Sequence, residues 1–245
     1  MRVIGVIPAR YSSKRLPYKL VRPLLGKPLI QWTWERAKSS HLLDKLIIAC
    51  DHPKIGEIAK EFGAEVVFTS SQHISGTDRI AEAVREMDVK VVVNIQADEP
   101  LIHPSVIDRL VVELLHNESL VMATVKKKIE EKEEINDPNV VKVVTDKDGF
   151  ALYFSRLPLP FVRDKGREVD YYKHIGIYAY TKDFLFIFKN LPRSSLEKAE
   201  KLEQLRALEA GYKIKVIETN FESWGVDSEE DLRKVEKVLT EKGGA

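Results

Sequence analysis

The chain has 245 residues, of which 44% are hydrophobic, and this is enough to bury a sizeable core in one large domain, residues 1–245. Its 39 basic and 38 acidic residues leave a net charge of +1, so we expect no nucleic-acid partner and no attraction to anionic membranes. The single cysteine excludes an internal disulfide, and no apolar run reaches the roughly 18 residues of a membrane-spanning helix. We therefore expect a cytoplasmic protein.

A cation-rich loop follows the first predicted strand. Residues 3–8 form an apolar run that is typical of a strand buried on both faces. Ligands of open α/β sheets bind at the carboxyl ends of strands, so cations and hydroxyls in this loop indicate an anion site, most plausibly for a polyphosphate. A solvated basic loop would have the same composition, and this alternative stays open. The side chains concerned are Arg10, Ser12, Ser13, Lys14, Arg15 and Lys19.

Strand and helix patterns alternate in the first half of the chain. The spacing predicts helices over 28–37, 53–62, about 75–87 and 104–115, and strands over 45–50, 65–68, 91–95 and 120–126. Such alternation requires right-handed crossovers and produces a mostly parallel sheet with helices on both faces. We therefore predict an α/β fold with a mostly parallel open sheet of the Rossmann-like type, in which 91–95 is the central strand.

Two polar motifs flank this central strand in the sequence. The first, Ser75 to Arg79, opens a helix, and its Ser, Thr and Asp residues are common helix caps, so capping alone would explain them. The second, Gln96 to Pro100, contains Asp98 directly after the strand. A carboxylate held there can bind a divalent metal against phosphates. We disfavour a capping role for Asp98 because the next helix is predicted to begin several residues later, at 103–104.

The rhythm changes between residues 129 and 180. Strand patterns at 140–145 and 150–154, joined by a turn, predict an antiparallel arm inserted at about 129–180. Its apolar, proline-rich stretch 157–160 could cover an active site, pack on a second subunit, or do both. The alternation of His174, Gly176 and Tyr178 places these residues on one strand face. They are a plausible wall for a hydroxyl-rich ligand, although a lone histidine is more often structural.

The C-terminal part contains further helix patterns. Residues 184–188 predict a buried helix, and 195–210 predict one amphipathic helix, on which periodicity alone makes Glu203 and Gln204 solvated surface. A strand at 213–218 precedes the final helix, which Ser228 caps. Asp227 stands before this cap and is not needed for it.

Five motifs in this order resemble those of the 3-deoxy-manno-octulosonate (Kdo) cytidylyltransferases, the CMP-Kdo synthetase family. The N-terminal one reads Pro8-Ala9-Arg10-Tyr11-x-Ser13-x-Arg15-Leu16-Pro17-x-Lys19. The sequence departs from the family pattern at three positions, which usually hold Gly, Pro and Gly: Tyr18, Leu20 and Ala97. The resemblance implies a nucleotidyltransferase that moves CMP from CTP to the anomeric hydroxyl of Kdo, releasing pyrophosphate, in lipopolysaccharide synthesis.

The resemblance also implies roles for individual residues. Those expected to bind the nucleotide are Arg10, Ser13, Arg15, Lys19, Thr77, Asp78, Arg79, Gln96 and Asp98, and those expected to bind the sugar are Arg156, His174, Tyr178, Glu203 and Gln204. The catalytic group would be Arg10, Arg15, Lys19, Asp98 and Asp227, with Mg²⁺ held by the two aspartates. The arm is expected to form a homodimer.

Two rival functions remain at this stage. A CMP-sialate synthetase or a sugar-1-phosphate nucleotidyltransferase would share the cationic loop and the acids, but should differ around Arg156, His174 and Glu203. A noncatalytic nucleotide-binding module would need neither both acids nor a sugar pocket. The presence of both Asp98 and Asp227 argues against this module.

Overall fold

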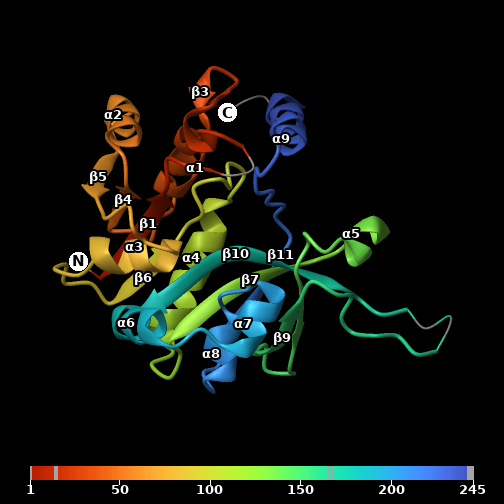
Figure 1. Ribbon diagram of the computed structural model, residues 1–245. Coiled ribbons are helices and arrows are strands. Elements are labelled where there is room, and N and C mark those ends of the chain that lie inside the picture. The colour runs from red at the N-terminus through yellow and green to blue at the C-terminus, as the bar shows by residue number, and fades with distance from the viewer. Residues whose placement is uncertain (1, 14–15, 165, 167, 242–245) are drawn as a thin grey trace.

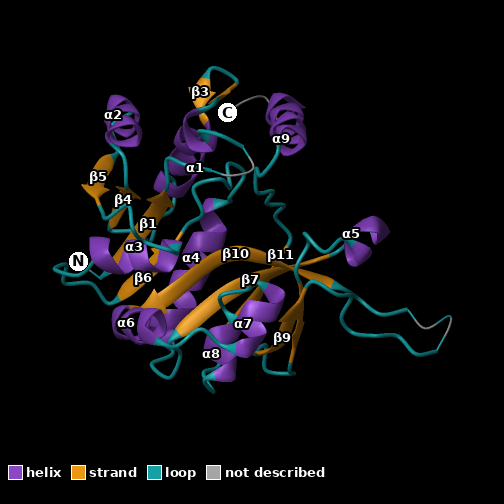
Figure 2. Cartoon of the chain, in the orientation of Figure 1, coloured by secondary structure: helices purple, strands orange, loops and turns teal. Residues whose placement is uncertain are grey.

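The computed structural model describes residues 2–13, 16–164, 166 and 168–241. In this part of the chain, a nine-stranded sheet has the main order β11-β7-β10-β6-β1-β4-β5 (Figures 1 and 2). Four of the six neighbouring pairs are parallel, because only β10 runs antiparallel to β6 and β7. The predicted mostly parallel α/β sheet is confirmed, and β6 is its middle strand. The strands are β1 (Val3–Ala9), β4 (Lys45–Cys50), β5 (Glu65–Phe68), β6 (Val91–Asn94), β7 (Met122–Lys128), β10 (Tyr172–Thr181) and β11 (Lys215–Thr219).

Helices cover both faces of the sheet because each buried strand is apolar on both sides. One face packs against α1 (Leu29–Lys38), α2 (Pro53–Glu61) and α4 (Pro104–His116). The other face packs against α3 (Gly76–Ala83), α6 (Lys182–Asn190) and α8 (Leu205–Glu209). The alternation along β1 shows this directly, since Val3 and Ile7 belong to the first apolar cluster and Ile4 and Val6 to the second.

A third, smaller apolar cluster lies beyond the sheet. It joins α9 (Glu229–Glu241) to α1 and to the short ribbon of β2 (Pro23–Leu24) and β3 (Lys27–Pro28). A short 3₁₀ helix, Lys19–Val21, precedes this ribbon. Val226 is fully buried in the cluster, next to Asp227. The chain that leads into α9 is thereby held close to the loop after β1.

The antiparallel excursion consists of a hairpin and a long projecting segment. Strands β8 (Lys142–Thr145) and β9 (Ala151–Ser155) pair as predicted, and the following chain extends away from the sheet before β10 (Figure 1). A short helix that the sequence did not suggest, α5 (Lys132–Asn136), precedes the hairpin. Strand β10, which carries His174 and Tyr178, is an integral strand of the main sheet.

The prediction of one helix over 195–210 is wrong. The chain forms α7 (Ser195–Glu200) and α8, which are separated by residues 201–204, the first of which, Lys201, has left-handed backbone (φ 57°). The amide of Lys201 closes α7 by donating to the carbonyl of Glu197. A continuous helix would have left Glu203 and Gln204 on its surface, whereas the break turns both side chains toward the sheet.

Candidate active site

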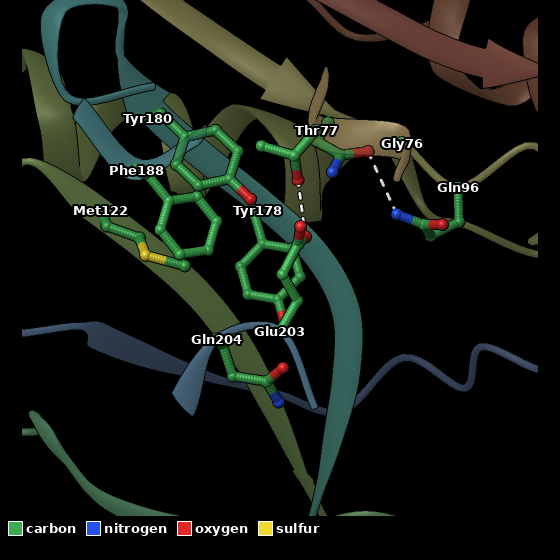
Figure 3. Close-up of a pocket in the computed structure, with 10 residues that line it drawn as sticks. Gly76, Thr77, Gln96, Met122, Tyr178, Tyr180, Phe188, Glu203 and Gln204 are labelled. Atoms are coloured by element: carbon green, nitrogen blue, oxygen red, sulfur yellow. Dashed lines mark hydrogen bonds between the residues drawn. The ribbon is translucent and has the colours of Figure 1, made fainter. Parts of the chain in front are cut away.

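Two cavities open beyond the carboxyl ends of β1 and β6, and Gln96 lines both. The larger has a volume of about 370 Å³, and its polar lining includes Arg10, Ser12, Ser13, Lys19, Gln96, Asp98 and Asp227. The smaller has a volume of about 120 Å³ and is lined by Thr77, Tyr178, Glu203, Gln204 and other residues (Figure 3). One cavity therefore collects the cations and acids, and the other collects uncharged polar groups around a single carboxylate.

Lys19 joins the two aspartates in the larger cavity. Its Nζ lies 2.5 Å from Oδ2 of Asp98 and 2.9 Å from Oδ1 of Asp227. Burial lowers the pKa of Lys19, but its contacts with the two carboxylates outweigh this effect and raise the pKa. The structure thus brings together three side chains from the loop after β1, the loop after β6 and the segment before α9.

The loop after β1 presents its cations at the same cavity. Arg10 donates from Nε to the carbonyl of Ser12 at 3.0 Å, and Oγ of Ser13 accepts from the amide of Leu16 at 3.4 Å. Arg15, predicted to bind phosphate, lies outside the described residues. Tyr18, where the family pattern has Gly, adopts the left-handed backbone (φ 56°) that Gly would adopt freely.

Glu99 belongs to the site, although it was not among the residues predicted for it. It follows Asp98, and its carboxylate accepts a hydrogen bond from Oγ of Ser223. Burial and, to a smaller extent, the charges of Asp98 and Asp227 raise the pKa of Glu99 to about 7. The pair of acids behind one buried strand indicates a metal site in the sequence, but only Asp98 of this pair was predicted as a site residue.

The smaller cavity brings a motif at the start of α3 against the break between α7 and α8. Oγ1 of Thr77 donates to Oε2 of Glu203 at 2.6 Å, and Arg206 lies 3.1 Å from the other oxygen of Glu203. Burial raises the pKa of Glu203 despite these contacts. Thr77, predicted to contact the nucleotide, therefore lies with the residues predicted for the sugar.

Further residues of this cavity were missed. Tyr180, Phe188 and Met122 gather on one side of it, opposite Thr77 and Gln96 (Figure 3). Tyr180 could have been found, because the alternation that includes Tyr178 continues to it. Among the described residues, the buried Nε2 of Gln204 has no hydrogen-bond partner. The cavity thus contains a donor available to a ligand.

Four predicted site residues do not line either cavity. Arg79 is 2% exposed and pairs with Asp51 at 3.0 Å, and Asp78 accepts from the hydroxyl of its neighbouring helix cap, Ser75. His174 shares a hydrogen bond with Thr124, and burial lowers its pKa to about 3. Arg156 donates to the carbonyls of Glu200 and Pro138, both at 2.7 Å. These side chains are instead engaged by other groups of the protein.

The residues at the larger cavity fit a hydrated magnesium ion. No group of three or more His, Cys, Asp or Glu side chains placed to hold a metal is found within the described ranges. Asp98 and Asp227 nevertheless direct carboxylate oxygens at one cation, the Lys19 ammonium. Magnesium commonly uses one or two protein carboxylates, with waters and substrate phosphates as its other ligands.

Comparisons with known proteins identify the family. A family model described as cytidylyltransferase matches residues 4–214. The chain is 49% identical to a protein of Solibacter usitatus named 3-deoxy-manno-octulosonate cytidylyltransferase, over 97% of this chain and 94% of that protein. It is 48% identical to a protein of the same name from Thermodesulfovibrio yellowstonii, over 98% of each chain.

Solved structures agree with this assignment. The chain superposes with a TM-score of 0.93 on the structure of CMP:2-keto-3-deoxy-manno-octonic acid synthetase complexed with CTP, at 37% identity, covering 99% of this chain and 100% of that one. A cytidylyltransferase from Leptospira borgpetersenii shares the fold, with a TM-score of 0.65 at 20% identity, over 98% of this chain and 87% of the other. No helix in the described part of the chain is long and apolar enough to cross a membrane. The chain belongs to the cytidylyltransferase family, among the 3-deoxy-manno-octulosonate cytidylyltransferases.

Proposed function

We propose that the protein transfers CMP from CTP to the anomeric hydroxyl of 3-deoxy-D-manno-octulosonate (Kdo), giving CMP-Kdo and pyrophosphate for lipopolysaccharide synthesis. The observation that carries the proposal is the joining of two cavities at Gln96, one with Lys19, Asp98 and Asp227 and the other with polar groups around Glu203. The names of its relatives, which cover nearly the whole chain, support both substrates. A noncatalytic nucleotide-binding module would need no second cavity.

The reaction is a single displacement. The anomeric oxygen forms a bond to the α-phosphorus of CTP, the bond to the bridging oxygen breaks, and pyrophosphate leaves with that electron pair while the hydroxyl proton is lost to solvent. Arg10 and Lys19, together with Arg15, offset the negative charge that develops on the phosphates. No protein nucleophile is required.

Asp98 and Asp227 are the residues that would hold Mg²⁺. When bound, the ion would supply Lewis-acid stabilisation of the phosphates and lower the pKa of the attacking hydroxyl. The two acids act together with Lys19, which lies between them and can contact the phosphates of CTP when the nucleotide binds. In this arrangement the cations bind the negatively charged nucleotide, and the two acids orient the reacting groups.

The smaller cavity is the proposed sugar subsite. Tyr178, Glu203 and Gln204 offer hydroxyl, carboxylate and amide groups to a polyhydroxylated ligand. The ring of His174 lies 5.4 Å from that of Tyr178, and Arg156 donates to the carbonyl of Glu200 near the break that carries Glu203. We therefore assign them the support of the subsite, and Thr77 joins the sugar-binding group through Glu203.

Pyrophosphate release tests the proposal. The enzyme is incubated with CTP and Mg²⁺ together with Kdo, sialic acid or a sugar 1-phosphate, and we expect release with Kdo only. Release with sialic acid would make the protein a sialate synthetase, and release with none of the acceptors would favour a nucleotide-binding module.

Two conservative variants test the role of the acids. Asp98→Asn and Asp227→Asn keep the side-chain volume but remove a charge, so each should fold normally and lose turnover by about 100-fold or more. Because the acids act as a unit, the double variant should be little worse than either single one. Near-normal turnover in Asp227→Asn would contradict a shared metal site.

We also propose that the enzyme acts in the cytoplasm as a homodimer formed through residues 158–161. Leu157, directly before this stretch, and Phe161, its last residue, are 71% and 86% exposed, which is unfavourable for apolar side chains left in water. Two-fold dimers are the commonest way for identical chains to cover such a surface.

A further inference from the structure

The segment that carries Asp227 has no regular secondary structure of its own. Between the end of β11 at Thr219 and the start of α9 at Glu229, the described chain forms neither helix nor strand. Backbone hydrogen bonds of a sheet or helix therefore cannot fix the direction of the Asp227 carboxylate. Asp98, in contrast, lies in the turn that follows the central strand β6 (Val91–Asn94), four residues after the last residue of that strand. The pairing of the two acids therefore depends on the contacts that this segment makes with neighbouring parts of the chain.

Glu99 makes such contacts from the Asp98 side. Its carboxylate accepts a hydrogen bond from the hydroxyl of Ser223, four residues before Asp227. Its other oxygen faces Gly225, where a Cβ atom would lie 3.4 Å away. A backbone bond from the amide of Val226 to the carbonyl of Asp98, at 2.9 Å, runs alongside. Glu99 thus contacts the segment at two positions just before Asp227.

The opposite end of the segment is anchored elsewhere. Glu222 lies 2.6 Å from Nζ of Lys127 on β7 and 3.1 Å from Nζ of Lys173 on β10, and both lysine side chains are less than 10% exposed. This anchor holds the segment to the sheet but lies five residues from Asp227. The Ser223–Glu99 hydrogen bond is the next side-chain contact along the segment toward Asp227, and it connects the segment to the loop that carries Asp98.

We propose that Glu99 is a positioning residue that holds the Asp227 segment, through Ser223, so that Asp227 faces Asp98. The inference rests on the proposed function, which gives Asp98 and Asp227 the role of holding the metal. It adds Glu99, to which the proposed function gives no role. Partners that orient metal-binding carboxylates typically change metal affinity or activity by 10- to 100-fold when they are removed. Loss of the Ser223–Glu99 hydrogen bond should therefore weaken metal binding by the two acids without removing either carboxylate.

The test removes the Ser223–Glu99 hydrogen bond by changing its donor, Ser223, which is not adjacent to Asp98 in the sequence. Ser223→Ala loses the hydroxyl, Ser223→Thr keeps it, and Ser119→Ala, an exposed serine on another loop, is the matched control. Mn²⁺ binding in the presence of CTP is followed by electron paramagnetic resonance, and CTP binding without metal is followed by calorimetry. We expect Ser223→Ala to bind Mn²⁺ about 10-fold or more weakly, with metal-free CTP affinity within about twofold of the wild type. Ser223→Thr and Ser119→Ala should bind Mn²⁺ like the wild type.

Two results would overturn the proposal. Unchanged Mn²⁺ affinity in Ser223→Ala would show that the Ser223–Glu99 hydrogen bond does not position Asp227. A loss in Glu99→Gln far greater than in Ser223→Ala would make Glu99 a metal ligand itself, because glutamine keeps an acceptor for Ser223. None of these binding measurements needs a sugar acid, so failure of the proposed reaction would be recognised separately, by the absence of pyrophosphate release from the wild-type enzyme.

Discussion

At the scale of single residues, Lys19 has the most consequential position in the molecule. Its ammonium lies between Asp98 and Asp227, where its single positive charge offsets part of the negative charge of the two acids. A divalent ion held by the same acids would be repelled by Lys19, by about 8 kcal/mol for charges of +2 and +1 that are 4 Å apart at an effective dielectric constant of ~20. The phosphates of CTP provide an alternative partner for Lys19 in the same cavity. Metal and nucleotide should therefore bind cooperatively.

Replacing Lys19 should uncouple the two ligands. In Lys19→Met the ammonium is lost and the aliphatic stem is kept, so the free enzyme should bind Mn²⁺ about tenfold or more tightly, whereas CTP should bind more weakly. Calorimetry with each ligand alone measures both effects, and Lys54→Met, at an exposed site on α2, is the control. Mn²⁺ affinity that is unchanged or weaker in Lys19→Met would contradict the competition between the ammonium and the metal.

His174 should make protein stability sensitive to acid. Burial lowers its folded-state pKa to about 3 from 6.5, so the unfolded chain takes up a proton first. The contribution to the free energy of unfolding is complete above about pH 6.5 and is lost as the pH falls toward 3. Urea unfolding at several pH values should therefore show a shallower decrease for His174→Gln than for the wild type. His116→Gln, at an exposed position, should decrease as the wild type does.

At the scale of elements, the sequence was most informative where local pattern decides the structure. The strands at 45–50 and 65–68 are observed with those bounds, because apolar runs bounded by turns have few alternative structures. The break at Lys201 was not predictable from an amphipathic repeat, because Glu203 behind it contacts Thr77, which lies 126 positions away in the sequence. Local periodicity carries no information about such distant partners.

The same limit applies to the candidate site. The convergence of Asp98 and Asp227 followed from strands ending at one sheet edge and from a helix that needed only Ser228 as its cap. The burial of Arg79 did not follow, since its partner Asp51 lies 28 positions away in the sequence. A cation in a motif can serve the ligand or the fold, and only the tertiary structure distinguishes the two roles.

The break between α7 and α8 places a testable residue, Gln204, in the proposed sugar subsite. Gln204→Met keeps the side-chain length but removes the unpartnered amide, so the KM for Kdo should rise about tenfold while CTP affinity stays within about twofold. Steady-state kinetics and calorimetry measure the two quantities, and Gln72→Met, at an exposed position, is the control. Equal losses for both substrates would argue against separate subsites.

At the scale of the whole molecule, the sheet and the projecting segment differ in how far their apolar side chains are buried. The sheet is covered on both faces, so its apolar surface is satisfied within one chain. The segment after β9 extends from this body and exposes Leu157 and Phe161, which no described residue buries (Figure 1). Large exposed apolar groups on an extension commonly mark a contact with another chain. A single chain thus buries the apolar surface of its sheet but leaves apolar side chains of its arm exposed.

A charged substitution in the arm should therefore separate the proposed homodimer without unfolding the sheet. Phe161 is 86% exposed, and Phe161→Glu would place a charge in the contact, where burying it unpaired costs several kcal/mol. Light scattering at micromolar concentration should give twice the 28.0 kDa chain mass for the wild type and the mass of one chain for Phe161→Glu. Ile74→Glu, at a residue 72% exposed beside α3, should remain dimeric. A wild-type protein that scatters as a single 28.0 kDa chain would rule out the dimer, and the arm would then need another partner or cover its own apolar side chains.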